Sequence, residues 1–404
     1  SLIIAYVLLM TGYYFMGEVS SYTSVFLVFL WVAVGAAMFK PVASAIITKN
    51  TDESNSTLGF GIFYMMVNIG GFVGPAMSST LRTQYGWKII FLQAAIVIGI
   101  NLIILLLFYK ETDRVKSTET IGEAILSSFK NIIEAVKDTR LSVLLVIMVG
   151  FWTMFNQLFY TLPTFIEDWV DTAALHNSIA EISPWLASFM SGGGTSINPE
   201  MLINIDAGAI IVFQLLVSYF VLKMRHVSAM ITGFIIASIG IGITFYTGNG
   251  LYTILGIVIF AIGEMMTNPT FSSFIALISP KGKEALYMGT YFLPIFLGNF
   301  LTTFISGNLY EAWSDKISLL QNEMASRNII MPEISKEFTK NDYFASASEK
   351  LGMTQTEMTQ MVWDTYNPNK IWYVIVAIGI VTILALAIYD RMVIRPKEAA
   401  AKSI

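Results

Sequence analysis

The segment GIVIFAIGEMMTNPTFSSFIALISP, residues 256–280, decides the fold. It is long enough to cross a bilayer, because a spanning helix needs about 20 mostly apolar residues. It nevertheless carries a carboxylate, Glu264, near its middle. A charge at bilayer depth costs at least ~2.5–3.5 kcal/mol on insertion scales, so such a residue usually faces a polar cavity and has a function. We therefore expect a membrane protein with a polar site around this position.

The composition agrees with a polytopic membrane protein. The 404 residues are 55% hydrophobic and 13% charged, with a mean hydropathy of +0.65, whereas a soluble domain carries about a quarter charged residues. The net charge of −4 provides no basic footprint for nucleic acid. The chain has no Cys and two His, and its motifs include no Ser/His/Asp set, metal cluster or phosphate loop. We predict no enzyme activity, no metal and no cofactor.

Ten apolar segments along the chain are candidates for membrane-spanning helices, the first of them short. They predict an all-α protein that lies in the lipid bilayer. The predicted spans are residues 2–17, 23–48, 58–80, 87–109, 141–165, 207–223, 227–247, 252–279, 286–309 and 371–391.

Lys and Arg residues gather in one set of connections between these spans, which predicts that this set is cytoplasmic. The C-terminus is then inside, and we expect a multi-pass protein of the inner (plasma) membrane. The residues concerned are Lys49, Lys110, Arg114, Lys116, Lys130, Lys137, Arg140, Lys223, Arg225, Lys281, Lys283, Arg391, Arg395 and Lys397.

An amphipathic stretch divides the chain. The sequence IGEAILSSFKNIIEAVKD places apolar residues on one face and charges opposite, which predicts a helix at the cytoplasmic surface. Four spans precede it and six follow, as in a transporter of two six-helix halves that lacks its first two helices. The predicted parts are an N-terminal bundle (1–109), a linker helix (110–140), a C-terminal bundle (141–391) with non-cytoplasmic segments 170–206 and 310–370, and a cytoplasmic tail (392–404).

The two non-cytoplasmic segments contain helical patterns of their own. The first has a possible short helix near 176–190, and the second has patterns near 317–327 and 354–366. The second segment is too long for a simple connection, and it predicts a small cap or a membrane-lying piece.

Lys40 is the first candidate site residue. It precedes Pro41, which disturbs the helix by removing a hydrogen bond. It lies about nine residues, or ~13 Å, from the cytoplasmic end of its span. A lysine that snorkels to the interface is the alternative, but the depth and the adjacent proline favour a cation that lines a cavity.

Two further polar groups sit on helix faces. Tyr64 and Asn68 are four residues apart and share a face, either as a substrate wall or as a hydrogen-bonded helix contact. Trp152, Asn156 and Tyr160 likewise share a face, which suits a substrate wall and ordinary packing equally.

Glu264 is too far from either end of its span to snorkel, and Pro269 follows five residues later. One reading is a protonated carboxyl hydrogen-bonded within a helix contact. The other is a functional carboxylate whose ionisation depends on its burial and on a nearby lysine, which makes it a candidate proton site.

These motifs together resemble the proton-coupled oligopeptide transporters (POT/PTR), a branch of the major facilitator superfamily. GAAMFKPVASA is similar to the family's fourth-helix Lys-Pro motif, and GIFYMMVNIGGFVGP to its fifth-helix Phe-Tyr-Asn signature. FWTMFNQ is similar to the seventh-helix motif, and the stretch from IGEMMTNP to FLGN to the tenth and eleventh helices. The match covers about a third of the chain and implies a major facilitator fold with two bundles around a central cavity.

The resemblance also implies roles for the candidate residues. Lys40 would attract the substrate carboxylate and take part in proton coupling, while Tyr64 and Asn68 would hydrogen-bond the peptide. Glu264 would pair with the peptide's amino terminus. Tyr291 takes the place of the family's eleventh-helix Trp and would keep an aromatic wall.

Some positions depart from the family pattern. Asn156 replaces a seventh-helix acid associated with protonation, and an amide cannot titrate. Asp206 lies where the family has an eighth-helix Asn, so an acid gained there would compensate. The first-helix E-x-x-E-R motif is absent from the sequence and would fall before Ser1, and we expect the chain to begin part-way through a longer one.

These observations predict a proton-coupled symporter of di- and tripeptides that works by alternating access, with Lys40 and Glu264 holding the two ends of the substrate. Its expected partners are small peptides, protons and the bilayer, with no nucleic acid, and we expect a monomer. A major facilitator transporter of another small zwitterion or anion is the alternative, and a non-transporting membrane sensor is the second.

Overall fold

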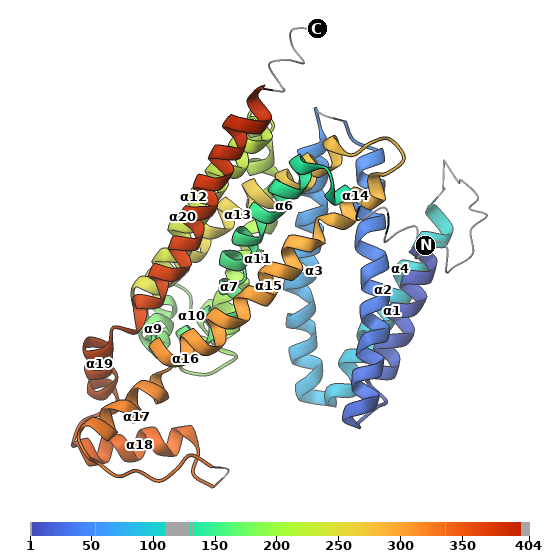
Figure 1. The fold of residues 1–404 in the computed structure, drawn as a ribbon. Coiled ribbons are helices and arrows are strands. Elements are labelled where there is room, and N and C mark those ends of the chain that lie inside the picture. Colours follow the sequence, from blue (N-terminus) through green and yellow to red (C-terminus); the bar gives the residue numbers. More distant parts are fainter. Residues whose placement is uncertain are drawn as a thin grey trace. The chain divides into compact units, whose positions relative to one another are not determined.

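The computed structural model describes residues 2–52, 54–109, 130, 133, 135–335 and 337–396, and helices dominate this part of the chain (Figure 1). Most of the predicted linker helix, residues 110–140, lies outside the described residues, as does the tail beyond residue 396. The described chain forms two compact units. Unit 1 comprises residues 1–142, 214–226 and 269–292, and unit 2 comprises residues 143–213, 227–268 and 293–404.

The helices up to the linker and those that carry the site have the following bounds. They are α1 (Leu2–Met16), α2 (Tyr22–Lys49), α3 (Ser56–Tyr85), α4 (Trp87–Phe108), α6 (Thr139–Phe155), α7 (Gln157–Tyr160), α8 (Leu162–Trp169), α11 (Pro199–Val221), α12 (His226–Tyr246), α13 (Gly250–Ile278), α14 (Glu284–Thr290) and α15 (Phe292–Phe304).

The remaining helices are short connections or belong to the C-terminal part of the chain. They are α9 (Thr172–Ile182), α10 (Pro184–Ser191), the π-helix η1 (Ile305–Leu309), α16 (Tyr310–Trp313), α17 (Lys316–Ser326), α18 (Lys340–Leu351), α19 (Gln355–Tyr366), the 3-10 helix η2 (Pro368–Lys370), α20 (Ile371–Tyr389) and the π-helix η3 (Asp390–Ile394).

The membrane-spanning helices predicted from hydropathy are confirmed. Within the described residues, nine helical segments are long and apolar enough to cross a membrane, and the shorter apolar helix α1 adds to them. Two predicted spans are interrupted. The span 141–165 is divided into α6, α7 and α8, and the span 286–309 into α14, α15 and η1.

Close helix packing depends on glycine in both units. In unit 1, a Cβ added to Gly12 of α1 would lie 2.6 Å from Val32 of α2, so only a residue without a side chain fits there. In unit 2, a Cβ on Gly263 of α13 would lie 2.4 Å from the backbone oxygen of Gly233 in α12. Small residues at helix contacts allow backbones to approach in this way, and the close contacts supply van der Waals packing inside a membrane.

Three helices form the α17–α19 subdomain (residues 316–366), which lies at the end of α20 opposite the C-terminus (Figure 1). Thr339 and Thr354 begin α18 and α19 as capping boxes with Asp342 and Glu357, respectively. Each box satisfies two backbone N–H groups that a helix start would otherwise leave unpaired. These short polar helices are therefore stabilised locally at their first turns.

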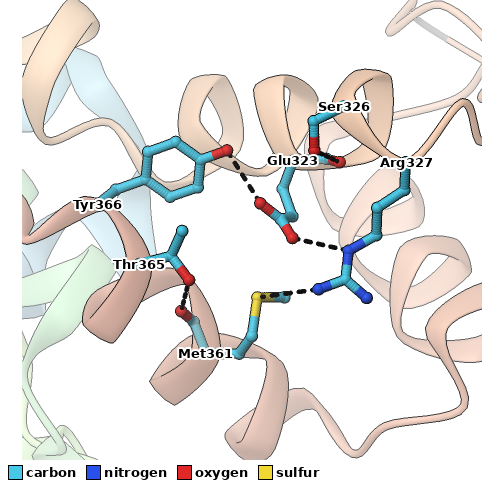
Figure 2. Close-up of polar contacts among 6 residues, drawn as sticks. All are labelled: Glu323, Ser326, Arg327, Met361, Thr365 and Tyr366. Carbon is cyan, nitrogen blue, oxygen red and sulfur yellow. Dashed lines mark hydrogen bonds and ion pairs between the residues drawn. The ribbon is translucent and has the colours of Figure 1, made fainter.

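A buried carboxylate joins α17 to α19 (Figure 2). Glu323 accepts hydrogen bonds from the Arg327 Nε at 2.7 Å and from the Tyr366 hydroxyl at 2.9 Å. Arg327 also approaches the sulfur of Met361 at 3.8 Å. Because Glu323 is 7% exposed, these charge-assisted contacts hold the two helices in one register.

Candidate functional site

The predicted site residues are divided between the two units. Unit 1 holds one set and unit 2 holds the other. The pairing of Lys40 with Glu264 stays a prediction. Unit 1 contains Lys40, Tyr64, Asn68 and Tyr291, and unit 2 contains Trp152, Asn156, Tyr160, Asp206 and Glu264.

Lys40 lies in α2, nine residues before the end of the helix at Lys49, and its side chain is exposed. The ammonium nitrogen is 5.9 Å from the centroid of the Phe292 ring, within the range of a cation–π contact. α2 also packs against α14. Unit 1 thus brings Lys40 to the segment that contains Tyr291, two sites that sequence separates by about 250 residues.

Tyr291 lies at a break between α14 and α15. Its ring is 5.1 Å from Phe271 and 5.2 Å from Phe292, measured between centroids. Tyr291, the residue predicted to keep an aromatic wall, therefore belongs to an aromatic cluster at the end of a broken helix. Broken helices are where membrane transporters expose backbone groups and build binding sites.

Tyr64 and Asn68 share a face of α3, as their spacing predicts. The Asn68 side-chain nitrogen donates to the backbone oxygen of Tyr64 at 2.9 Å. One amide N–H is thereby used within the helix, and the Asn68 carbonyl oxygen and the Tyr64 hydroxyl remain the groups that could meet a ligand. Both side chains are half-buried.

Unit 1 also contains a buried hydroxyl cluster that the sequence did not reveal. Ser273 of α13 donates to the Ser56 hydroxyl of α3 at 2.8 Å, and Thr57 contributes a third hydroxyl at 3.4 Å. The His226 Nε2 lies 3.1 Å from the Ser273 oxygen. Ser273 is fully buried and Ser56 nearly so. This cluster joins the first turns of α3 and α12 to the C-terminal half of α13, beside loops predicted to be cytoplasmic.

A second contact in unit 1 lies one turn along α3. A Cβ added to Gly61 would lie 2.3 Å from the Ser218 Oγ and 3.4 Å from the Gln214 amide nitrogen, both in α11. α3 therefore contacts α11 with almost no space between them. Segments from the predicted N-terminal and C-terminal bundles meet here, and the bundle boundaries themselves stay a prediction.

Glu264 lies at the centre of α13 in unit 2, fourteen residues from Gly250 and fourteen from Ile278. Its side chain is fully buried. Neither carboxylate oxygen accepts a hydrogen bond of full geometry among the described residues, and the Asn268 amide one turn further along is the polar group that approaches it. A buried carboxylate without full satisfaction is costly, so Glu264 remains a candidate functional residue.

Asp206 occupies the buried stripe of α11. Leu202, Ile203, Ala209 and Ile210 on either side are all buried, and this three- and four-residue spacing defines the inward face of the helix. Asp206 is 3% exposed and its Oδ1 has no hydrogen-bond partner in the described chain. Unit 2 therefore places a second unsatisfied acid in its interior, where the sequence predicted a compensating acid.

The seventh-span residues are separated by the break in their helix. Trp152 and Asn156 are each 6% exposed, whereas Tyr160 is 51% exposed. Trp152 lies against Gly298 of α15, because a Cβ added to Gly298 would come 2.4 Å from the Cβ of Trp152. Trp152 therefore lies where α6 packs on α15. Asn156 stands between α6 and α7, and its Nδ2 has no hydrogen-bond partner among the described residues. The ligand roles of Trp152 and Asn156 stay predictions.

A charged cluster missed by the sequence lies at the end of α8. The Tyr310 hydroxyl donates to the Asp168 carboxylate at 2.7 Å, and the backbone N–H of Lys316 approaches it at 3.5 Å. Burial raises the pKa of Asp168 to about 6, and the Tyr310 hydrogen bond and the Lys316 charge oppose that rise. No sequence pattern marks this cluster, because its members are about 150 residues apart.

The part of the chain that the structure describes contains no group of three or more His, Cys, Asp or Glu side chains that could hold a metal ion. Unit 2 contributes two buried acids and one amide without a hydrogen-bond partner in the described chain, and unit 1 contributes one lysine.

Comparison with known proteins agrees with this architecture. Residues 1–200 match the Major Facilitator Superfamily. The chain is 28% identical over 109 residues to the uncharacterized transporter YclF of Bacillus subtilis (strain 168), and 30% identical over 106 residues to dipeptide and tripeptide permease B of Aliivibrio fischeri (strain MJ11). Each alignment covers 26% of this chain, and the matched segments span 22% and 21% of the two relatives.

A solved structure described as a bacterial homologue of the human drug peptide transporters PepT1 and PepT2 is similar in fold. Its TM-score is 0.58 at 16% identity, with 97% of this chain and 83% of that chain covered. At that identity the likeness concerns the fold alone. The chain therefore has the major facilitator fold, and its first 200 residues match that superfamily.

Proposed function

We propose that the chain is a proton-coupled symporter of di- and tripeptides, lying as a monomer in the inner (plasma) membrane with its C-terminus in the cytoplasm. The observation that carries the proposal is Glu264, a fully buried carboxylate at the middle of α13 whose oxygens lack a full set of partners. A peptide ammonium is a partner that would satisfy it, since every free peptide carries an amine and a carboxylate whatever its side chains.

Lys40 is the proposed partner of the substrate carboxylate. It is exposed within unit 1 and beside the aromatic cluster of Tyr291 and Phe292. A cation on one half and an anion on the other would hold the two ends of a peptide and tolerate variety between them. Tyr64, Asn68 and the orphaned amide of Asn156 would supply hydrogen bonds along its backbone.

Proton coupling is assigned to the two buried acids of unit 2. The seventh-span position is an amide, Asn156, so the proton must be carried elsewhere. Asp206 and Glu264 are both buried and incompletely satisfied. Proton uptake there would change the charge balance of the site and bias an equilibrium between two conformations, with the cytoplasmic contacts of Ser56, Ser273 and His226 closing one of them.

The test is proton-driven uptake of dialanine into proteoliposomes. Glu264→Gln and Lys40→Ala should each reduce uptake at least about tenfold, because removing one charge of a buried recognition pair typically costs 2 kcal/mol or more. Glu333→Gln, an exposed acid of the α17–α19 subdomain, is the matched control and should retain uptake. Full retention by both site variants would exclude the charge-clamp mechanism.

A second candidate function keeps the fold and changes the substrate. Asn156 in place of an acid is the observation that favours it, because an amide at a helix break suits a neutral or anionic group as well as an ammonium. In a panel of peptides, amino acids and organic anions, uptake of an amino acid or anion but of no peptide would select this candidate. Uptake that is independent of a proton gradient would also contradict the first.

A further inference from the structure

A large cavity lies in unit 2, and none of the residues of the proposed transport site lines it. Its volume is about 1070 Å³, and the residues that line it come from the end of α8, from α9, from the loop between α12 and α13, and from the α17–α19 subdomain. The segments 170–206 and 310–370, which supply most of this wall, are predicted to be non-cytoplasmic. The cavity is therefore the part of unit 2 that a solute outside the cell would meet.

The charges of the cavity wall do not cancel. Three carboxylates line it, Glu167, Asp168 and Asp171, against one ammonium, Lys316. Lys316 already has cation–π partners within the protein, since its nitrogen lies 5.5 Å from the centroid of the Trp169 ring and 5.2 Å from that of the Phe344 ring. Asp168 is occupied as well, by the Tyr310 hydroxyl. The charge of Lys316 acts on Glu167 as well as on Asp168, so the wall keeps a net negative charge that Glu167 and Asp171 share.

Glu167 and Asp171 are both exposed, and neither has an ion-pair partner among the residues described. Asp171 accepts the backbone N–H of Ala174 at 2.8 Å as the N-cap of α9, which fixes its position. Trp363 and several amides and hydroxyls complete the wall. A concave, polar surface with two unpaired carboxylates attracts cations and raises their local concentration.

We infer that this cavity binds small amine-bearing solutes, with the ammonium group between Glu167 and Asp171 and the polar remainder against the amides of α19. The inference rests on the proposed function for its role, which is to collect peptides at the non-cytoplasmic side before they enter the transport site. The solute class follows from the wall: its carboxylates attract an ammonium, and Trp363, which packs against Phe165 and Trp169, adds an apolar contact.

The variants for the test preserve the fold. Glu167→Gln keeps the size of the side chain, and Asp171→Asn keeps the helix cap, because Asn caps as well as Asp. The control pair is Glu333→Gln with Glu349→Gln. These two exposed acids belong to the α17–α19 subdomain and do not line the cavity. The control pair removes the same net charge as the Glu167/Asp171 pair. Circular dichroism should give the wild-type helix signal for both double variants.

Binding is measured on the purified full chain by tryptophan emission at low ionic strength, with Trp363→Phe identifying the signal from the cavity. The probes are alaninamide, which carries an amine and no carboxylate, dialanine, which carries both, and N-acetylalanine, which has no amine. The Glu167/Asp171 double variant should raise the dissociation constant of alaninamide about three- to tenfold relative to the control pair, and salt should reduce the difference. N-acetylalanine should leave the emission unchanged.

Equal affinity in the two double variants, or a response to N-acetylalanine as large as that to alaninamide, would overturn the inference. Absence of any alaninamide signal in the wild type would overturn it too. Dialanine uptake separates this result from the proposed function. Normal uptake without cavity binding refutes the inference alone, whereas cavity binding without uptake of any peptide refutes the proposed function alone. With both intact, the double variant should raise the KM for dialanine and leave the maximal rate unchanged.

Discussion

The Tyr310 hydroxyl donates a 2.7 Å hydrogen bond to the Asp168 carboxylate and so ties the end of α8 to the start of α16. Both residues are largely removed from water, Tyr310 at 4% exposure, and the contact joins two helices that are distant in sequence. The ionisation of Asp168 therefore acts on how firmly these helix ends are held.

The stability of this region should depend on pH in a defined window. Burial raises the pKa of Asp168 from 3.8 to about 6, so the folded chain holds a proton that the unfolded chain releases. The contribution of Asp168 to the free energy of unfolding is then greatest below pH 4. It falls by ~3 kcal/mol as the pH rises towards and through 6.

Asp168→Asn should abolish that pH dependence while keeping an acceptor for Tyr310. The measurement is thermal unfolding between pH 4 and 8, followed by tryptophan emission. Asp364→Asn, an exposed acid of α19, serves as the control and should follow the wild-type curve. A wild-type midpoint that rises with pH across this window would contradict the assignment.

Asp206→Asn should separate substrate exchange from proton-driven accumulation. The side chain is buried and its Oδ1 has no partner in the described residues, so an amide of the same shape fits without a cavity. We expect counterflow of labelled dialanine to persist and accumulation driven by a pH gradient to fall at least about tenfold, because the proposed proton uptake at this position would bias the conformational equilibrium. Glu200→Gln, at the exposed start of α11, should keep both activities.

Gly61→Ala should weaken the contact between α3 and α11, since the added Cβ would lie 2.3 Å from the Ser218 Oγ. We expect a loss of about 1–3 kcal/mol, the usual penalty of an extra methyl in a packed contact, and slower uptake. The double variant Gly61→Ala with Ser218→Ala removes the clash but also the hydrogen bond that the Ser218 hydroxyl accepts from the Gln214 amide at 2.9 Å, so it should recover only part of the loss. Gly70→Ala is the control, because no described atom lies within 4 Å of a Cβ at that position.

Tyr366→Phe should loosen the α17–α19 subdomain. The hydroxyl donates to the buried Glu323, and loss of one hydrogen bond to a charged group costs about 1.5–3 kcal/mol. Hydrogen exchange of α19 should quicken, while exchange in α12 and α13 stays unchanged. Tyr373→Phe, an exposed hydroxyl on α20, should change neither. Unaltered exchange in α19 would show that Arg327 alone satisfies Glu323.

The hydropathy of the chain was sufficient to predict the spanning helices and the position of Glu264. Polar helices were predicted less well. The patterns near 317–327 and 354–366 are confirmed as α17 and α19, but α18 was not predicted, although Tyr343 and Ala347, four residues apart, form its buried face. A signal was present: Thr339 and Asp342 form a capping box, the same spacing that begins α19.

The break at Asn156 could not be predicted, since the position itself is neither Gly nor Pro. The break at Tyr291 does have a local signal, because Pro294 disturbs the helix four residues earlier, at Thr290, where α14 ends. His226 has no recognisable partner in the sequence. It is the first residue of α12 and contacts Ser273, a residue 47 positions away that only the fold brings close.

The glycine contacts between α12 and α13 have a mechanical consequence. Gly233 and Gly263 bring the two backbones so near that neither helix can slide past the other without a collision. Glu264 follows Gly263 directly, so its carboxylate cannot change surroundings unless α12 travels with it. Under the proposed proton coupling, the part that moves with Glu264 would be this helix pair, and substitutions on the outer face of α12 should alter the rate of turnover.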